Sequence, residues 1–476
     1  MQGVYRVAQI RAAEERLMAQ LPDGALMARA STALAGVCAR QLRLRTGRLY
    51  GSSAVLLVGS GNNGADALFA GAILAGRGVR VQAALLDPPR THAAGLAALI
   101  SAGGRIVTTS AASAVRATDL VVDGILGIGG RGALRPEAAE LVAAITDALV
   151  VAVDIPSGVD ADSGVVEGAS VPADLTVTFG GLKAGLVTGA GAARSGQVRL
   201  VDIGLELPEP DVQVLEERDV ASLLRQPSET DDKYTRGVVG VIAGSAQYSG
   251  AGLLATGSAR RGGAGMVRYL GTAPEQIRAH YPDVVVHDAT APGDVRVQAW
   301  VIGPGIGTDA AAGRLLAQTL ATDVPVLVDA DAITLLAEQK QLLAERRAPT
   351  LLTPHDREFE RIAGPVSGDR LESARRAARE LNVTLLLKGD ATVVAAPDGT
   401  AFVNTTGTPW LGTAGSGDVL SGLIGSILAT GIEAALAAAT GAYLHGVAGQ
   451  LAGADGNPDA TDVLNRLPLA VASVRR

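Results

Sequence analysis

A run of small residues that ends in an acid is the part of the sequence best suited to chemistry. Gly412-Thr413-Ala414-Gly415-Ser416-Gly417-Asp418 leads directly into an apolar stretch of helical character. Consecutive small residues let successive backbone N–H groups point at one anion, and the N-terminus of a following helix adds favourable dipole charge. The Asp418 carboxylate could then take the proton of a hydroxyl that attacks a phosphoryl group. The alternative, an ordinary N-capping turn, would need one capping residue and none of the glycines.

Other segments of the C-terminal half carry ligand-binding features at expected strand ends. Lys388-Gly389-Asp390-Ala391-Thr392 joins two expected strands, so its cation and hydroxyl could meet a nucleotide phosphate. Gly303-Pro304-Gly305-Ile306-Gly307 follows a strand and precedes a helix, which suits backbone contact with a ligand. His355 follows Thr353-Pro354 at a further strand end. A lone histidine is more often a turn or surface residue, so the residue alone leaves its role open.

A second glycine-rich turn lies in the N-terminal half. The apolar run Val55–Val58 leads into Gly59-Ser60-Gly61-Asn62-Asn63-Gly64-Ala65-Asp66 and then into a helical segment. Such a turn exposes backbone N–H groups to phosphate oxygens at the positive end of a helix dipole. The same pattern also occurs in tight strand-to-helix turns that bind nothing, so alone it leaves both interpretations open.

Two further loops of this half place oxygen-bearing side chains at strand ends. They are Asp123-Gly124-Ile125-Leu126-Gly127-Ile128-Gly129 and Asp154-Ile155-Pro156-Ser157-Gly158-Val159-Asp160. In a doubly wound sheet the carboxyl ends of the strands line one crevice, where ligands bind. Asn63, Asp123 and Ser157 could then offer hard oxygen ligands to one cation, leaving Asp154 as a candidate for proton transfer. Asp123 and Asp154 could equally well cap turns.

A layered α/β scaffold would position these loops. Val7, Ile10, Glu14 and Leu17 recur at helical spacing and predict an opening helix. Short, nearly continuous apolar runs follow, which indicate strands buried on both faces of parallel sheets covered by helices. The expected strands are Val55–Val58, Val79–Leu86, Leu120–Val122, Leu149–Asp154, Leu175–Phe179, Val238–Ala243, Met266–Leu270, Val297–Ile302, Val326–Asp329, Thr350–Thr353, Val383–Leu387 and Thr392–Ala395.

The chain is long enough for two domains. Its 476 residues exceed the size at which one hydrophobic core usually stops growing. The segment Leu205–Asp232 interrupts the α/β pattern with prolines, acidic residues and no sustained strand, so we place the boundary there. We expect domains at residues 1–210 and 225–476, the second ending with Ala-rich helices at about Gly417–Ala429 and Ala434–Leu451.

Composition argues against several classes of partner. The net charge of -7 and the scattered basic residues offer no general field for a nucleic acid. Cys38 is the only cysteine, which excludes an internal disulfide and suits a reducing cytoplasm. Residues Met1–Glu15 lack the apolar core of a signal peptide, and no run of about 18 apolar residues predicts a membrane span.

The N-terminal motifs together resemble the NAD(P)H-hydrate epimerase family, over residues 1 to about 210. The resemblance implies a Rossmann-like three-layer sandwich in which Asn63, Asp123 and Ser157 ligate potassium and Asp154 contacts the reacting ring. Lys183 also fits a family position, without an assigned role, and Ala65 and Ala67 stand where the family usually has glycine. The residues implied to hold the hydrated cofactor, besides Asp154, are Asn62, Asn63, Gly64, Ala65, Asp66, Gly127, Ile128, Gly129, Gly130, Arg131, Gly132 and Ala133.

The C-terminal half is similar to the ribokinase-like superfamily, and more closely to ADP/ATP-dependent NAD(P)H-hydrate dehydratases, over roughly residues 225 to 470. Lys233–Gly237 and Gly244–Gly252 add to the motifs already described, although the family often has glycine near Arg357 and another residue at Gly252. The resemblance implies a ribokinase-like α/β sandwich. The hydrate would be contacted by Ala251, Gly305, His355 and Asp418, and the nucleotide by Lys388, Gly389, Asp390, Ala391, Thr392 and Gly417.

The two resemblances imply a bifunctional isomerase and lyase that repairs hydrated NADH and NADPH (NADHX and NADPHX). The epimerase half would use K⁺ and interconvert the R and S hydrates, and the dehydratase half would use Mg²⁺ and ADP or ATP. The resemblance implies ADP as the donor in bacterial members, giving AMP and phosphate, and ATP in eukaryotic members. Homo-oligomers are common for this architecture.

Two other functions stay open on the sequence alone. One is a ribokinase-like kinase that phosphorylates a small alcohol and releases a stable product. The other treats the N-terminal half as a binding module, since related folds occur in RNA-decapping scaffolds, although the acidic balance counts against this. The sequence also leaves open the choice of ADP or ATP and any channel between the sites.

Overall fold

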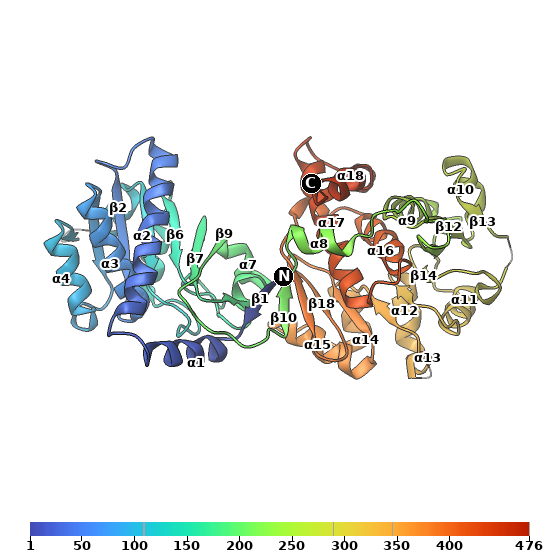
Figure 1. The fold of residues 1–476 in the computed structure, drawn as a ribbon, viewed down its shortest axis with the longest axis horizontal. Coiled ribbons are helices and arrows are strands. Elements are labelled where there is room, and N and C mark those ends of the chain that lie inside the picture. The colour runs from blue at the N-terminus through green and yellow to red at the C-terminus, as the bar shows by residue number, and fades with distance from the viewer. Residues whose placement is uncertain (108–109, 289, 345, 476) are drawn as a thin grey trace. The chain divides into compact units, whose positions relative to one another are not determined.

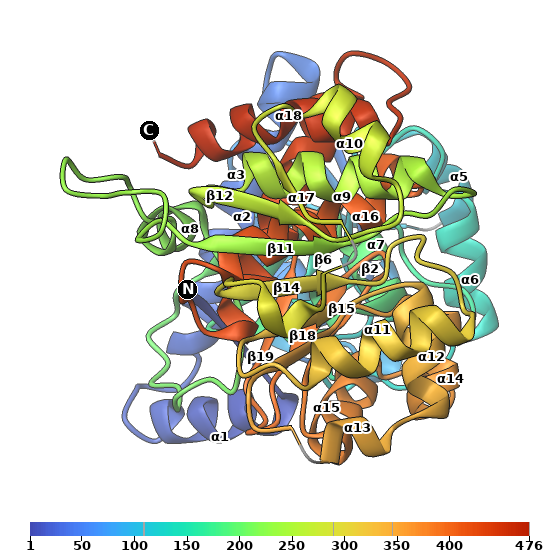
Figure 2. The ribbon, with the colours of Figure 1, turned by 90° about the vertical axis from the view of Figure 1, so that its right-hand side faces the viewer.

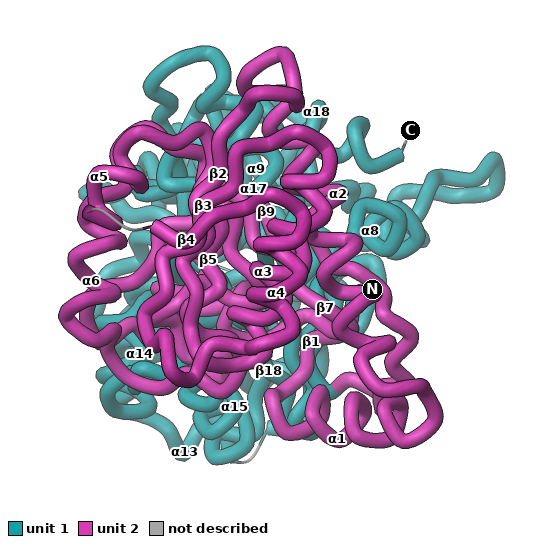
Figure 3. Tube along the Cα trace, turned by 90° about the vertical axis from the view of Figure 1, so that its left-hand side faces the viewer, with its two compact units in different colours: residues 1–2, 211–476 teal, residues 3–210 magenta. Residues whose placement is uncertain are grey.

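The chain forms two compact units, each with its own sheet and core. A computed structural model describes residues 1–107, 110–288, 290–344 and 346–475 (Figure 1). One unit is Gly3–Pro210, and the other is Asp211–Arg476 together with Met1–Gln2 (Figure 3). Each unit is described by itself below.

The N-terminal unit is built on a parallel sheet with strand order β4-β3-β2-β5-β6-β7-β9. The chain winds outward from β2 to β4, then returns to β5 beside β2 and continues in the opposite direction. The neighbours β2 and β5 therefore flank the switch point where α/β sheets bind ligands. The strands are β2 (Ser53–Val58), β3 (Arg80–Leu85), β4 (Arg105–Ile106), β5 (Leu120–Gly124), β6 (Leu149–Val153), β7 (Leu175–Phe179) and β9 (Gln197–Val201).

Helices cover both faces of this sheet because successive strand residues point to opposite sides. In β2, Leu56 and Val58 pack with α2 and α3 in one core cluster, whereas Val55 and Leu57 pack with α5 and α6 in another. The helical elements are α1 (Val7–Met18), α2 (Ala25–Thr46), α3 (Asn62–Gly76), η1 (Pro88–Arg90), α4 (Ala93–Ser101), α5 (Ala111–Arg116), α6 (Pro136–Ala143), η2 (Ala184–Leu186) and α7 (Gly189–Ser195), and the short strands β1 (Gln2–Tyr5) and β8 (Leu182–Lys183) pair in parallel. The predicted three-layer sandwich is confirmed.

The C-terminal unit contains a larger mixed sheet with strand order β13-β12-β11-β14-β15-β16-β17-β18-β19-β10. Pairing is parallel from β13 to β17 and antiparallel through β18 and β19. The strands are β10 (Val212–Val214), β11 (Val238–Ile242), β12 (Met266–Tyr269), β13 (Val285–Val286), β14 (Ala299–Ile302), β15 (Val326–Val328), β16 (Thr350–Leu352), β17 (Thr384–Leu387), β18 (Thr392–Ala395) and β19 (Ala401–Asn404).

Two helical layers sandwich this sheet as well. Helices α9, α16, α17 and α18 share one core cluster, whereas α11 and α12 share another on the opposite face (Figure 2). A methyl group at Gly422 of α16 would lie 2.0 Å from the Ala255 carbonyl oxygen of α9, so these helices pack backbone to backbone. The helical elements are α8 (Glu217–Leu223), α9 (Ser249–Arg261), α10 (Pro274–His280), η3 (Pro292–Asp294), α11 (Ala310–Leu320), α12 (Asp331–Glu338), α13 (Gln341–Ala344), α14 (Asp356–Ala363), α15 (Arg370–Leu381), η4 (Pro409–Leu411), α16 (Ser416–Leu428), α17 (Ala434–Gly453) and α18 (Ala460–Ser473).

The structure differs from the sequence prediction mainly at the edges of the sheets. Every expected strand is present, with ends that differ by at most two residues, but β1, β4, β8, β9, β10, β13 and β19 were not expected. The expectation that the chain ends with two Ala-rich helices is wrong, because α18 follows them. Residues 211–224, assigned to the linker, hold β10 and α8 and belong to the C-terminal unit. Among the described residues, no helix is long and apolar enough to cross a bilayer.

Candidate functional site

The loops after β2 and β5 meet at the switch point of the N-terminal sheet. A methyl group on Gly59 would lie 1.9 Å from the Ile125 carbonyl oxygen, so only glycine permits this approach. Helix α3 begins at Asn62, so the predicted cofactor-binding residues 62–66 lie at its N-terminal end. The alanine at position 67 is accommodated because its partner is Gly124, where an added Cβ would lie 2.7 Å from the Ala67 methyl carbon.

The predicted cation ligands Asn63, Asp123 and Ser157 lie together. The Ser157 hydroxyl donates to Asp123 Oδ1 over 2.7 Å, and the Ser157 N–H donates to Oδ2 over 2.8 Å. Leu126 links the set, because its N–H donates to Ser157 Oγ and its carbonyl accepts from Asn63 Nδ2. Burial raises the pKa of Asp123 to about 6, against the hydrogen bonds from Ser157. A buried carboxylate surrounded by hydroxyl, amide and carbonyl oxygens suits a hard cation.

Asp154 forms a buried ion pair with Lys183. Lys183 Nζ lies 2.6 Å from Asp154 Oδ1, and the lysine side chain is 1% exposed. The same oxygen accepts from the Thr178 hydroxyl over 3.1 Å and from the Phe179 N–H over 3.2 Å. Asp154 has a φ of +66°, a left-handed conformation that Asp adopts more readily than most residues. This turn directs Oδ1 at the lysine. Lys183, whose role the sequence left open, is therefore the direct partner of the predicted catalytic acid.

Two further acids interact electrostatically with this pair. Burial, followed by the charges of Asp154 and Glu14, raises the pKa of Asp66 to about 8. Asp66 is 8% exposed, and its Oδ1 has no hydrogen-bond partner among the described residues. Burial and Asp154 also raise the pKa of Glu14 in α1. The sequence identified Glu14 only as part of the amphipathic pattern, because nothing in that pattern relates α1 to the loop after β6.

The predicted cofactor loop Gly127–Ala133 leaves β5 and stays largely accessible. A methyl group on Gly127 would lie 2.5 Å from Asn63 Oδ1, so this glycine brings the loop against the first turn of α3. A methyl on Gly129 would lie 3.2 Å from the Arg11 guanidinium of α1. Ile128, Gly130, Arg131, Gly132 and Ala133 form the remainder of the loop and are half-buried or exposed.

In the C-terminal unit, Gly417 and Asp418 occupy the first turn of α16. Gly415 caps this helix with a φ of +88°, a conformation that favours glycine. The Asp418 carboxylate accepts no hydrogen bond from the residues that the structure describes. Burial and the charge of Asp329 raise its pKa to about 7, against the opposite effect of Lys388. An unbonded carboxylate that titrates near neutrality is suited to accept a proton.

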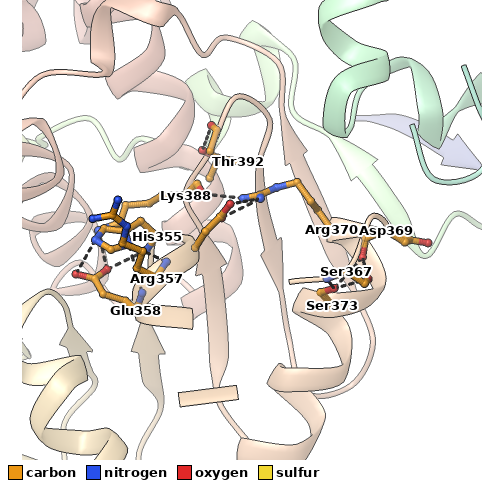
Figure 4. Close-up of polar contacts among 11 residues, drawn as sticks. His355, Arg357, Glu358, Ser367, Asp369, Arg370, Ser373, Lys388 and Thr392 are labelled. Carbon is orange, nitrogen blue, oxygen red and sulfur yellow. Dashed lines mark hydrogen bonds and ion pairs between the residues drawn. The ribbon is translucent and has the colours of Figure 1, made fainter. Parts of the chain in front are cut away.

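Lys388 lies at the end of β17 and points toward the same helix. Its Nζ is 2.8 Å from Asp329 Oδ1 and 3.7 Å from Glu358 Oε2, and a methyl on Gly417 would lie 3.5 Å from it. Figure 4 shows Lys388 with His355 and Glu358 on one side and Arg370 on the other. Arg370 donates to the Lys388 carbonyl oxygen over 2.7 Å, which fixes the start of the predicted nucleotide loop.

The rest of that loop is short and close to Arg370. A methyl on Gly389 would lie 2.5 Å from the Arg370 guanidinium, so a larger residue would displace this contact. Asp390 is exposed and Ala391 is buried, whereas Thr392 donates its hydroxyl to the Gly389 carbonyl over 3.4 Å. The sequence predicts that the Lys388 cation and the Thr392 hydroxyl meet a nucleotide phosphate, whereas in the structure the hydroxyl is hydrogen-bonded within the loop.

His355 is a capping residue as well as a candidate ligand contact. Its Nδ1 accepts from the Arg357 and Glu358 N–H groups, and Glu358 Oε2 accepts from the His355 N–H over 2.9 Å. This reciprocal arrangement is a capping box at the start of α14. The side chain is 51% exposed, and its Nε2 lies 3.4 Å from Glu358 Oε1.

Ala251 and Gly305, both predicted to contact the hydrate, are adjacent. Gly305 has a φ of +64°, and a methyl there would lie 2.8 Å from the Ala251 methyl carbon. A methyl on Gly252 would lie 3.2 Å from the Ala243 carbonyl oxygen. The glycine at 252, which departs from the family pattern, thus allows α9 to begin close to the end of β11.

Comparisons with known proteins decide the family. Residues 239–468 match the family model described as NAD(P)H-hydrate dehydratase, and residues 23–185 match that of the YjeF-related protein N-terminus. The chain is 50% identical over 461 residues to the bifunctional NAD(P)H-hydrate repair enzyme Nnr of Mycobacterium leprae (strain TN), covering 96% of both. The Mycobacterium tuberculosis (strain ATCC 25618 / H37Rv) protein of that name is 50% identical over 442 residues, covering 92% of both. The chain belongs to the bifunctional NAD(P)H-hydrate repair enzymes.

A solved structure supports the fold of the dehydratase half. A ribokinase-like superfamily protein from Enterococcus faecalis V583 aligns with a TM-score of 0.51 and 26% sequence identity, covering 57% of this chain and 99% of that chain. The ribokinase-like prediction for the C-terminal unit of this repair enzyme is therefore confirmed.

Sequence reasoning missed several polar residues of the dehydratase half. Asp329 is buried and holds Lys388, while Asp331 Oδ2 accepts from the Gly307 N–H over 2.9 Å. Glu358 contacts both Lys388 and His355. Asp329 ends an expected strand, and that position could have identified it by the rule used for Asp123. Ser421 donates its hydroxyl to Asp329 Oδ2 over 2.7 Å. No comparable signal marked this serine, because it lies inside an apolar helix.

Proposed function

We propose that this chain repairs NADHX and NADPHX through two activities located in its two units. An epimerase in Gly3–Pro210 interconverts the R and S hydrates, and a dehydratase in Asp211–Arg476 converts the S hydrate with ADP to the reduced nucleotide, AMP and phosphate. Membership of the bifunctional repair enzymes supports both assignments. The observation that carries the assignment of the dehydratase centre is the unbonded Asp418 carboxylate at the start of α16, with a pKa near 7.

Dehydration begins with proton transfer to Asp418. As the ring hydroxyl attacks the terminal phosphoryl group, Asp418 accepts the hydroxyl proton and the bond from phosphorus to the departing nucleotide breaks. N–H groups at the start of α16 offset the charge on the transferred group, and the Lys388 ammonium adds positive charge beside Gly417. The ring then loses phosphate and the proton of the neighbouring carbon, which restores the double bond of the dihydropyridine.

Magnesium fits this half as a companion of the nucleotide. Among the described residues, no cluster of three or more His, Cys, Asp or Glu side chains could hold a metal ion. Mg²⁺ usually binds to substrate phosphates with only one or two carboxylates, and Asp331, whose charge acts on Asp418, would be the carboxylate to hold it. When bound, the ion would neutralise phosphate charge.

In the epimerase half, Asp154 faces the reacting ring, and the buried Lys183 holds it in place. The ion pair fixes one oxygen of Asp154, and the other oxygen is left for the substrate. Asp66, with a pKa of about 8, carries a proton at neutral pH and can donate it. Asn63, Asp123 and Ser157 would hold K⁺, since their oxygens fit a hard cation and one buried carboxylate supplies the charge. The ion would order the loops that receive the hydrate.

A single assay tests both activities. The purified chain is incubated with both NADPHX epimers and ADP or ATP, and the absorbance of reduced nicotinamide is followed. We expect recovery of the whole pool, because epimerisation feeds the S hydrate to the dehydratase. Recovery that stops at the S fraction would remove the epimerase assignment. A stable phosphorylated product without recovered absorbance would identify a kinase instead.

Oligomerisation and location stay predictions. We infer a homo-oligomer in the cytoplasm, with no nucleic acid partner given the net charge of -7. Cys38 is buried, and burial raises the pKa of its thiol to about 12, so it is a packing residue rather than a reactive thiol.

A further inference from the structure

A strained turn connects the two halves of the dehydratase site. Ala330 lies between Asp329 and Asp331 with a φ of +49°, a conformation that alanine rarely adopts. Among the described residues, Asp154 and Asn382 are the other non-glycine residues with positive φ. Backbone strain of this kind persists where surrounding contacts enforce it, and it is common at functional sites. The contacts of the two flanking carboxylates explain what enforces it here.

Asp329 bridges the nucleotide loop and α16. Its Oδ1 lies 2.8 Å from Lys388 Nζ, and its Oδ2 accepts from the Ser421 hydroxyl over 2.7 Å. The Asp329 side chain is 1% exposed, whereas that of Lys388 is 20% exposed. Asp329 therefore has both oxygens occupied, by residues 59 and 92 positions away in the sequence.

Asp331 fixes the loop Gly303–Gly307. Its Oδ2 accepts from the Gly307 N–H over 2.9 Å, at the end of the loop that contains Gly305. One turn thus fixes the Lys388 cation on one side and the predicted hydrate loop on the other.

Asp329 also determines which carboxylate pairs with Lys388. Lys388 is attracted by Asp329, Glu358 and Asp418, and only one ammonium is available to them. A fully buried carboxylate without a partner is costly, so the buried Asp329 takes the contact. Asp418, which is only half-buried, is left unbonded. Without Asp329, the nearest remaining carboxylates for Lys388 would include the proton acceptor itself.

We propose that Asp329, held by Ser421, is a positioning residue for dehydration. It fixes the Lys388 ammonium beside Gly417, where it faces the transferred phosphoryl group, and keeps it from pairing with Asp418. This inference rests on the proposed dehydratase function of the C-terminal unit.

The test compares Asp329→Asn, Lys388→Met, Ser421→Ala and the double variant Asp329→Asn/Lys388→Met in the full-length chain. We expect Asp329→Asn to lower kcat for dehydration about a hundredfold, with a smaller change in KM for ADP, because displacement of a catalytic group by about 1 Å has this effect. Ser421→Ala should lower kcat by less than tenfold. The double variant should be no slower than Lys388→Met, because Asp329 acts through the lysine.

The pH profile gives a readout that a merely structural role would not move. Asp418 is faced by Asp329 from the end of β15, Asp331 from α12, Glu358 from α14 and Lys388 from the end of β17. Removing the negative charge of Asp329 should move the acidic limb of the kcat profile to lower pH. Ser421→Ala, which keeps every charge, should move it less, and it serves as the second variant if Asp329→Asn does not fold.

Distinct outcomes separate the inference from the function it rests on. If the unmodified chain fails to dehydrate the S hydrate with ADP or ATP, the proposed function is wrong. If the unmodified chain is active and Asp329→Asn keeps kcat within threefold, or if the two single effects multiply in the double variant, the positioning role alone is wrong. Epimerisation by the same variants should be unchanged.

Discussion

Both sites place a lysine near the predicted catalytic acid, but they pair it differently. In the N-terminal unit Lys183 binds Asp154 directly over 2.6 Å. In the C-terminal unit Lys388 binds Asp329 instead, and Asp418 accepts no hydrogen bond from the described residues. The first arrangement fixes the orientation of the predicted catalytic carboxylate, whereas the second leaves the carboxylate of Asp418 without a fixed partner in the described part of the chain.

The difference matches the chemistry that each half performs. A hydroxyl that attacks a phosphoryl group needs a base that can accept its proton, and Asp418, with a pKa of about 7 and no hydrogen-bond partner among the described residues, meets that need. In the N-terminal unit, burial raises the pKa of Asp66 to about 8, so a residue outside the Asp154–Lys183 ion pair can carry a proton at neutral pH. In the N-terminal unit the ion pair (Asp154 with Lys183) and the protonated acid (Asp66) are therefore different residues. In the C-terminal unit the lysine pairs with Asp329 and not with the predicted base Asp418.

The largest effect is expected at the unpaired base. Asp418→Asn should lower the rate of dehydration by about a thousandfold, within the range for loss of a general base. Nucleotide binding and epimerisation should persist, since the backbone of α16 and the N-terminal unit are unchanged. Recovery of nicotinamide absorbance and calorimetric titration with ADP measure the two properties. Near-normal dehydration by this variant would show that Asp418 is not the base.

The next effect concerns the paired lysine. Lys183→Met leaves Asp154 buried without its cation, which should destabilise the N-terminal unit by about 3–5 kcal/mol and abolish epimerisation. Dehydration of the pure S hydrate should continue. Chemical denaturation and separate assays of the two epimers check this. A stable variant that still interconverts the hydrates would show that epimerisation does not need the ion pair between Lys183 and Asp154.

A third, smaller effect is a pH dependence of stability. The folded pKa of Asp66 is raised to about 8 from an ordinary value of 3.8, so the protonated form is favoured by folding. The N-terminal unit should therefore lose stability as pH rises from about 4 to about 8. Asp66→Asn should flatten this dependence. Thermal unfolding of the unmodified chain and of this variant at pH 5 and pH 8.5 provides the comparison.

The smallest effect is expected at Ala67. Restoring the glycine usual in the family should destabilise α3 by about 0.5–1 kcal/mol, because glycine is less favourable than alanine inside a helix. Epimerisation should change less than twofold, since the Ala67 methyl packs against Gly124 rather than facing the loops predicted to bind the hydrate. A large gain in epimerisation would show that the methyl group obstructs the substrate.

Sequence patterns predicted the central strands better than the edges. Runs such as Leu120–Val122 and Val383–Leu387 are apolar on both faces because helices cover both sides of each sheet. The missed strands β4 and β13 contain two residues each, and such short elements have no period to detect. β10 lies among prolines and acids, and it becomes a strand by pairing with distant segments such as β19.

The same contrast holds within the sites. Glycine-rich turns that precede a helix drew attention to the regions around Asn63 and Asp418, and for Asn63 the further loops at strand ends were needed as well. The partners of the reacting groups were not predictable, because each joins segments far apart in the chain. Asp329 and Ser421 are 92 residues apart in the sequence, and Asp154 and Thr178 are 24 residues apart. No local pattern encodes such pairs.

The left-handed backbone at Asp154 limits which replacements are informative. Alanine at this position would remove the carboxylate and also force a side chain that disfavours positive φ into that turn. A loss of epimerisation in Asp154→Ala would thus mix chemistry with distortion of the loop. Asparagine tolerates this backbone and keeps an oxygen for Lys183, so it is the replacement whose kinetics can be interpreted.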